Sequence, residues 1–227
     1  IAGVSFKAYR GQTIGIIGGT GSGKSSLVGL IPRFYDATEG EVLIDGVNVK
    51  DIKLEELRDK VGIVMQKAVL FKGSIRNNMQ VAKQDATDGE IDEALAIAQA
   101  KEFVDKKDGR LDSFVDQGGK NLSGGQRQRL TIARAVVKKP EILILDDSAS
   151  ALDFATDAAL RKSIRTMPNN PTVFIVSQRS ASLMHADKII VLDDGNVAGI
   201  GTHSELLANC EVYREIYNSQ FKSAKGA

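Results

Sequence analysis

A short run of small residues with one lysine offers the clearest chemistry in this sequence: Gly18, Gly19, Thr20, Gly21, Ser22, Gly23, Lys24 and Ser25. Its glycines let the backbone curl so that successive N–H groups point into one concave nest that binds anions. The run matches the P-loop pattern, in which the lysine reaches the outer phosphates of a nucleotide and the hydroxyl ligates Mg²⁺. The sequence therefore predicts binding of a nucleoside triphosphate together with Mg²⁺.

The segments on either side of this run fit the same prediction. Residues 13–17 form an apolar run typical of a short buried strand, and residues 26–31 have the pattern of the first turns of a helix. The N-terminus of such a helix adds partial positive charge beside the nest, so Ser26 is included among the predicted nucleotide contacts. The alternative is a glycine-rich turn without a ligand, which the complete pattern in its strand–loop–helix frame disfavours.

Composition and charge restrict the class of protein. The formal net charge is +1, so no basic surplus favours a nucleic-acid partner. No apolar run approaches the roughly 18 residues of a membrane span, and no secretory signal opens the sequence. A single cysteine, Cys210, excludes an internal disulfide framework. We expect a cytosolic, compact protein, with further sequence upstream of Ile1 because residues 1–6 already have the pattern of a strand.

Strand patterns alternate with helical patterns along the chain, which predicts an α/β fold with a mostly parallel sheet. Strands are expected at residues 61–65, 141–147 and 172–177, and hairpins at 41–49 and 189–200. Helices are expected within 75–107, where Thr87 and Glu90 form a capping-box pattern, and at about 122–139 and 204–221. We expect one domain over 1–221, with a helical subdomain at about 75–138 inserted in the α/β core and a solvated tail at 222–227.

A second motif, residues 122–126, has the sequence Leu-Ser-Gly-Gly-Gln at the start of the expected helix. We call it the signature motif. Its serine and two glycines, Ser123, Gly124 and Gly125, would present N–H groups and a hydroxyl that can grip a phosphate, with Gln126 following. The alternative is a plain helix start with Ser123 as the N-cap.

The P-loop and the signature motif together resemble the nucleotide-binding domain of an ABC transporter, over nearly the whole chain from Val4 to Phe221. The resemblance implies a P-loop NTPase (RecA-like) core, an antiparallel β subdomain and a helical subdomain that carries the signature. It implies ATP and Mg²⁺ as ligands, and a second such domain that meets this one head to tail, so that each signature closes over the partner's ATP. Residues 33–35, 70–75 and 201–206 resemble the exporter type, which implies an upstream transmembrane domain and a place at the cytoplasmic face of a membrane.

Further site residues follow from the resemblance, position by position. Asp146 matches the aspartate that ends a buried strand and holds Mg²⁺ directly or through water. Gln66 matches a glutamine that contacts Mg²⁺ and water, with a solvent-facing strand-end glutamine as the alternative. The expected metal ligands are therefore Ser25, Gln66 and Asp146, and Asp153 matches the loop that crosses the interface between the two domains.

Two catalytic positions depart from the family's pattern. Asp147 stands where the family has a catalytic glutamate, and Gln178 stands where it has a histidine. Aspartate is one methylene shorter, which withdraws its carboxylate by about 1.5 Å from the attacking water. Glutamine can hydrogen-bond a phosphate oxygen but cannot carry a proton as histidine does. We predict a degenerate site with low intrinsic hydrolysis, as in the weaker half of a heterodimeric exporter. The alternative is neutral drift with hydrolysis retained.

Two other assignments remain open. One is a homodimeric exporter that turns over slowly through Asp147. The other is an ABC ATPase of DNA repair or translation, which would carry a long insertion before the signature or a second domain on one chain. Neither feature is present in these 227 residues. The aromatic residue that stacks on adenine in this family is expected upstream of Ile1, and Tyr9 is a poor substitute for it.

Overall fold

The structure is a computed structural model that describes residues 1–148 and 150–222, so most of the predicted tail at 222–227 lies outside the described residues. The chain divides into two compact units, and each is described by itself. Unit 1 combines Ile1–Val61 with Thr172–Ala227, and unit 2 comprises Gly62–Pro171.

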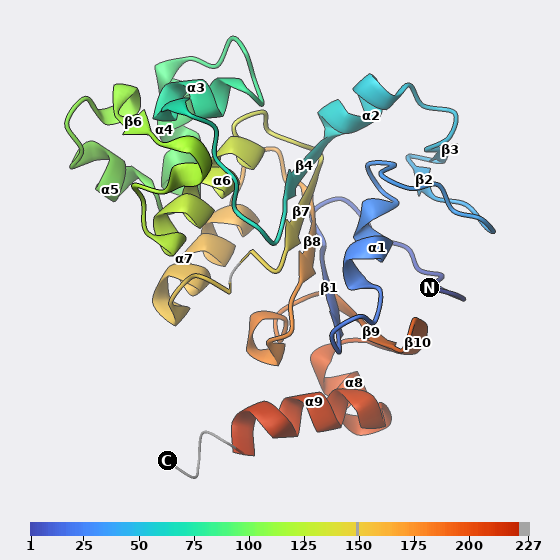
Figure 1. Cartoon of the computed structure of the whole chain (residues 1–227). Helices are drawn as coiled ribbons and strands as arrows, with labels where there is room; N and C mark the ends of the chain where they lie inside the picture. Colours follow the sequence, from blue (N-terminus) through green and yellow to red (C-terminus); the bar gives the residue numbers. More distant parts are fainter. Residues whose placement is uncertain (149, 223–227) are drawn as a thin grey trace. The chain divides into compact units, whose positions relative to one another are not determined.

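Unit 1 contains a sheet that carries the P-loop. Its strands lie in the order β10-β9-β1-β8, with β1 parallel to both β8 and β9 and with β10 antiparallel to β9 (Figure 1). The bounds are β1 (Thr13–Gly18), β8 (Thr172–Val176), β9 (Lys188–Asp193) and β10 (Asn196–Gly201). The apolar runs of β1, β8 and β9 are buried, and Ile14, Ile16 and Ile17 of β1 have no exposed surface. A continuous apolar run is what a parallel strand covered on both faces requires.

Unit 1 also contains a short strand pair and several helices. They are α1 (Lys24–Gly29), β2 (Leu43–Ile44), β3 (Val47–Asn48), α2 (Leu54–Lys60), η3 (Ser180–Ser182), α8 (His203–Asn209) and α9 (Glu211–Lys222). The predicted hairpin at 41–49 is confirmed, because β2 and β3 pair antiparallel across Asp45 and Gly46. These two turn residues have φ of 52° and 80°, a conformation that Asp-Gly tolerates.

Two predictions for unit 1 were wrong. Residues 1–6 do not form a regular strand, and their strand-like pairing is limited to an isolated parallel bridge between Ala2 and Asn196. The single helix expected at 204–221 is two helices, α8 and α9. They separate at Cys210, whose extended backbone (φ −118°, ψ 110°) ends the first helix, while its buried side chain packs inward.

Unit 2 contains strands, a group of helices and the signature motif. Its elements are β4 (Val61–Val64), β5 (Gly73–Ser74), α3 (Ile75–Gln80), α4 (Asp88–Ile97), α5 (Lys101–Asp105), η1 (Arg110–Asp112), β6 (Phe114–Val115), η2 (Gln117–Gly119), α6 (Gly124–Val136), β7 (Ile142–Asp146) and α7 (Phe154–Arg165). β4 and β7 are neighbouring, hydrogen-bonded strands, and α4 packs on α6. Thus the signature helix α6 rests on the helical part of this unit.

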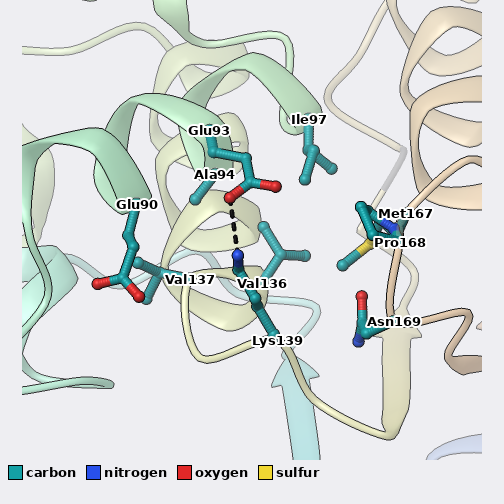
Figure 2. Close-up of a pocket in the computed structure, with 10 residues that line it drawn as sticks. All are labelled: Glu90, Glu93, Ala94, Ile97, Val136, Val137, Lys139, Met167, Pro168 and Asn169. Atoms are coloured by element: carbon teal, nitrogen blue, oxygen red, sulfur yellow. Dashed lines mark ion pairs between the residues drawn. The ribbon is translucent and has the colours of Figure 1, made fainter.

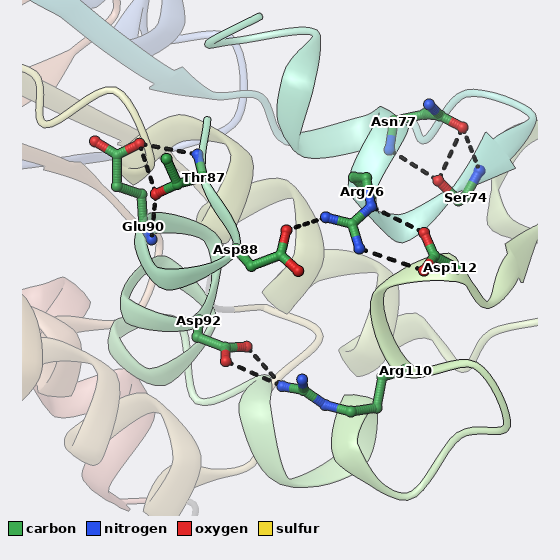
Figure 3. Close-up of polar contacts among 9 residues, drawn as sticks. All are labelled: Ser74, Arg76, Asn77, Thr87, Asp88, Glu90, Asp92, Arg110 and Asp112. Atoms are coloured by element: carbon green, nitrogen blue, oxygen red, sulfur yellow. Dashed lines mark hydrogen bonds and ion pairs between the residues drawn. The ribbon is translucent and has the colours of Figure 1, made fainter. Parts of the chain in front are cut away.

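Local hydrogen bonds and ion pairs fix the starts of the helices in unit 2, as Figure 3 shows. The predicted capping box of Thr87 and Glu90 opens α4, and Ser74 with Asn77 forms a second one at α3. Arg76 pairs with Asp88 and, at 2.9 Å, with Asp112. One guanidinium therefore joins the beginnings of α3 and α4 to η1.

Candidate functional site

The P-loop connects the end of β1 to the start of α1, as the sequence predicts. A Cβ atom on Gly18 would lie 2.1 Å from the carbonyl oxygen of Leu192 in β9, so only glycine fits at this close approach. Gly23 adopts a left-handed conformation (φ 94°) immediately before α1. Gly19 and Thr20 are exposed at the tip of the loop. The loop thus has the tight curl and open backbone that a phosphate cradle needs.

Lys24 places its cation within this loop. The side chain is 9% exposed, and its Nζ donates to the carbonyl oxygens of Gly18 at 2.9 Å and Gly19 at 2.6 Å. Ser25 and Ser26 are exposed at the first turn of α1. An ammonium held against the glycine backbone, beside exposed hydroxyls, fits a triphosphate with Mg²⁺.

Gln178 follows β8 at the same edge of the sheet. Ile16 of β1 is paired with Val176 of β8, and the next N–H, that of Ser177, donates to the carbonyl of Ile16 at 3.1 Å. β1 continues from there to Gly18, the first glycine of the P-loop. Unit 1 therefore brings the exposed Gln178 to the edge of the sheet from which the P-loop departs.

In unit 2, the structure brings together Gln66 and Asp147. Asp146 ends β7 and is 5% exposed, and Asp147 follows it with a left-handed backbone (φ 47°). Gln66 follows the neighbouring strand β4, and its Nε2 donates to Oδ2 of Asp147 over 3.4 Å. The strand-end glutamine thus contacts the carboxylate beside the predicted metal ligand.

The signature motif forms the first turn of α6. Ser123 is its N-cap and forms a capping box: its Oγ accepts from the N–H of Gln126 at 3.2 Å, and Oε1 of Gln126 accepts from the N–H of Ser123 at 3.1 Å. Nη1 of Arg127 donates to the carbonyl of Leu122 at 2.8 Å, which holds the preceding turn. Ser123 and Gly124 remain exposed. Both the cap and the phosphate-gripping interpretations of Ser123 are compatible with this geometry.

Asp153 has a local role that the sequence analysis missed. It caps α7, with Oδ1 accepting from the N–H of Thr156 at 2.9 Å and Oδ2 accepting from its hydroxyl at 2.8 Å. Because these bonds favour the charged form, the pKa of Asp153 is below its usual value. The spacing of an aspartate three residues before a threonine at a helix start could have revealed the cap.

Of the predicted Mg²⁺ ligands, Ser25 belongs to unit 1, whereas Gln66 and Asp146 belong to unit 2. Within residues 1–148 and 150–222, no group of three or more His, Cys, Asp and Glu side chains is arranged to hold a metal ion. The predicted ligands are a serine, a glutamine and one aspartate, so they are not a group of this kind. The donors are oxygen atoms of the kind that Mg²⁺ prefers.

A small pocket in unit 2 is separate from the predicted site residues (Figure 2). It lies near the end of α6, where Lys139 pairs with Glu93 at 2.9 Å, and it has room for about one water molecule at 10 Å³. It therefore offers no space for a nucleotide.

Comparison with known proteins identifies the family. A family model described as "ABC transporter" matches residues 1–150 of the chain. The chain belongs to the ABC transporter family. This ABC domain is 46% identical, over 224 residues, to an uncharacterized ABC transporter ATP-binding protein of Mycobacterium tuberculosis strain H37Rv, and the match covers 97% of the chain and 38% of that protein.

Two further comparisons support the resemblance to exporters. The ABC domain is 42% identical over 217 residues to the putative multidrug export ATP-binding/permease protein YgaD of Bacillus subtilis, covering 96% of the domain and 37% of YgaD. A structure of a bacterial Atm1-family ABC exporter with ATP bound matches with a TM-score of 0.91 and 36% identity, covering 96% of the domain and 38% of that chain. The prediction of a P-loop NTPase fold, homologous to exporter-type ABC proteins, is confirmed.

The ABC domain thus spans well under half the length of the relatives it matches. None of the helices in the described part of the chain has the length and apolar character that a membrane span requires.

Proposed function

We propose that this chain is the ATP-binding domain of an ABC exporter whose own nucleotide site hydrolyses ATP slowly. In this proposal the natural protein also contains a transmembrane domain, and the ABC domain acts at the cytoplasmic face of the membrane. A second, unlike ABC domain pairs with it head to tail. Support comes from relatives whose names include export and permease functions and of which this domain spans only 37–38%.

The P-loop and Asp146 are the residues that would hold ATP and Mg²⁺. Lys24 sits among the loop carbonyls at 2.6–2.9 Å, from which its flexible side chain can turn to phosphate oxygens. Mg²⁺, when bound, neutralises charge on the phosphates. The exposed hydroxyl of Ser25 and the carboxylate of Asp146 are the ligands proposed for it, with Gln66 as a further contact.

The observation that carries the proposal of slow hydrolysis is the placement of Asp147. Its short side chain accepts a hydrogen bond from Gln66 at 3.4 Å, so the carboxylate is directed to a neighbouring side chain. A general base needs a heavy-atom distance of about 2.6–3.2 Å to the proton donor, and its loss costs about 10²–10⁴ in rate. Gln178, at the other predicted catalytic position, is neutral and has no proton to relay.

The signature motif, in contrast, retains the features of a phosphate-binding turn. α6 is a helix of 13 residues, and Ser123 and Gly124 are exposed at its N-terminus. We propose that these residues, with Gly125, Gln126 and Asp153, complete the nucleotide site of the partner domain. Positioning and charge neutralisation supply most of the catalysis in phosphoryl transfer, so an intact signature matters to the partner's site.

The experiment compares two variants of this chain in the full-length, assembled transporter. Asp147→Asn removes a base that contributes little, so steady-state ATPase activity should fall by less than about twofold. Ser123→Arg places a bulky side chain in the exposed first turn of α6, and activity should fall by about tenfold or more, since a positioning defect near the reacting phosphate can cost 10² in rate. Equal losses would show that Asp147 is catalytic, as in a slow homodimeric exporter.

A further inference from the structure

A side chain near the end of α9 forms a clamp on the loop that carries Gln178. Nε2 of Gln220 donates to the carbonyl oxygen of Gln178 at 2.6 Å. Oε1 of the same amide accepts from both the N–H and the hydroxyl of Ser180, each at 2.9 Å. One amide group therefore bridges residues 178 and 180, which precede Gln220 in the sequence by 42 and 40 positions. We call these three hydrogen bonds the Gln220 clamp.

The clamp acts on a turn, residues 177–180, that begins and ends at buried serines and is also held by other hydrogen bonds. Ser180 has no exposed surface, so its N–H requires a partner within the protein. Residues on both sides are also held: the N–H of Ser177 donates to Ile16 of β1 at 3.1 Å, and the N–H of Arg179 donates to Oγ of Ser177 at 3.0 Å. The backbone of residues 177–180 is thus fixed against β1 on one side and α9 on the other.

The helix that supplies Gln220 is itself anchored. Tyr213 of α9 is completely buried and forms a 2.8 Å hydrogen bond with Nδ1 of His203 in α8. α9 packs on β9 and on η3, which begins at Ser180. A side chain that extends from an anchored helix can hold a loop in one position.

We propose that Gln220 is a positioning residue that aims Gln178 at the terminal phosphate of a nucleotide in the P-loop. The proposal rests on the function proposed above, in which Gln178 hydrogen-bonds a phosphate oxygen. Gln178 lies at the edge of the sheet where β1 leads into the P-loop, and its backbone carbonyl is a partner of the clamp. ATP carries this terminal phosphate and ADP lacks it. The clamp therefore raises the affinity for ATP and leaves the affinity for ADP unchanged.

The test uses Gln220→Met, which keeps the length of the side chain and removes both its donor and its acceptor. The matched control is Asn218→Met, at an exposed position of the same helix. The full-length, assembled protein is photoaffinity-labelled with azido-ATP, in competition with ATP or ADP. The label on this polypeptide reports its own nucleotide binding, separately from that of an unlike partner. Gln220→Met should raise the ATP concentration for half-competition by about tenfold, the value of a hydrogen bond to a charged group. Competition by ADP should not change.

A double variant separates positioning from a general loss of structure. Gln178→Ala should produce the same selective loss of ATP affinity, and adding Gln220→Met to it should cause no further loss. An equal weakening of ATP and ADP binding by Gln220→Met, or no change while Gln178→Ala weakens ATP, would overturn the positioning role.

Hydrogen exchange tests the clamp independently of nucleotide. Exchange in a peptide that covers residues 177–183 should become faster in Gln220→Met and stay unchanged in Asn218→Met. Unchanged exchange in Gln220→Met would overturn the clamp. If exchange becomes faster but Gln178→Ala leaves ATP affinity unchanged, the role proposed for Gln178 is wrong and the clamp is only structural.

Discussion

Nε2 of Gln66 donates to Oδ2 of Asp147 over 3.4 Å, which joins the residues that follow two neighbouring strands, β4 and β7. The contact is long for a hydrogen bond, so it directs the carboxylate without holding it tightly. Asp147 also has a left-handed backbone, at φ 47°, which aspartate adopts more readily than most residues. The reach of this short side chain is therefore the feature to test first.

Restoring the family's residues at both departing positions should raise turnover. Asp147→Glu adds the missing methylene and Gln178→His adds a group that can carry a proton, so ATPase activity of the assembled protein should rise by about tenfold or more. The control is Asp147→Gln with Gln178→His, which matches the length without a base and should not gain activity. A native site that already turns over near the enzyme median of about 10 s⁻¹ would contradict the degenerate-site hypothesis.

Removing the P-loop cation should weaken nucleotide binding. Lys24→Ala deletes the ammonium held at the carbonyls of Gly18 and Gly19, and we expect the ATP dissociation constant to rise by about tenfold or more. Calorimetric titration with ATP and Mg²⁺ measures this change. Lys53→Ala, at a side chain that is 84% exposed in the same unit, is the control and should bind as the native chain does. Equal affinities for Lys24→Ala and the native chain would remove the P-loop assignment.

Two adjacent glycines of the P-loop should differ sharply in tolerance. A Cβ on Gly18 would lie 2.1 Å from a backbone oxygen of β9, so Gly18→Ala should lower stability by about 1–3 kcal/mol as the strand and loop shift. A Cβ on Gly19 would meet no atom within 4 Å, so Gly19→Ala should have a native thermal midpoint. Calorimetric unfolding of both variants checks this, and a Gly18→Ala midpoint equal to that of Gly19→Ala would contradict the close approach.

The capping box at α4 should contribute measurably to stability. The Oγ of Thr87 accepts from the N–H of Glu90 at 3.3 Å, and Thr87→Ala removes this acceptor. The free energy of unfolding should fall by about 1 kcal/mol, the usual value of an N-cap, as measured by urea denaturation. Thr87→Ser keeps the hydroxyl and should retain most of the stability. A loss in the serine variant as large as that in alanine would show that the methyl group, not the cap, is what matters.

Local patterns let the sequence predict much of this protein. The P-loop lies in a strand–turn–helix whose glycines and lysine all fall within residues 18–24, and Glu90 of the capping box follows Thr87 by three positions. In such segments the residues that interact are close in the chain, so their types and spacing are sufficient. The same locality explains why the signature motif was placed correctly at the start of α6.

Tertiary structure decided the features that depend on distant partners. The expected strand at residues 1–6 pairs only through Ala2, and the expected last helix divides at Cys210 because its side chain is drawn into the core. Neither the contact between Gln66 and Asp147 nor the Gln220 clamp has a sequence pattern, since each joins residues on separate elements. A side-chain amide meets its partner only after the sheet and helices have packed, and that packing depends on long-range burial that no local spacing encodes.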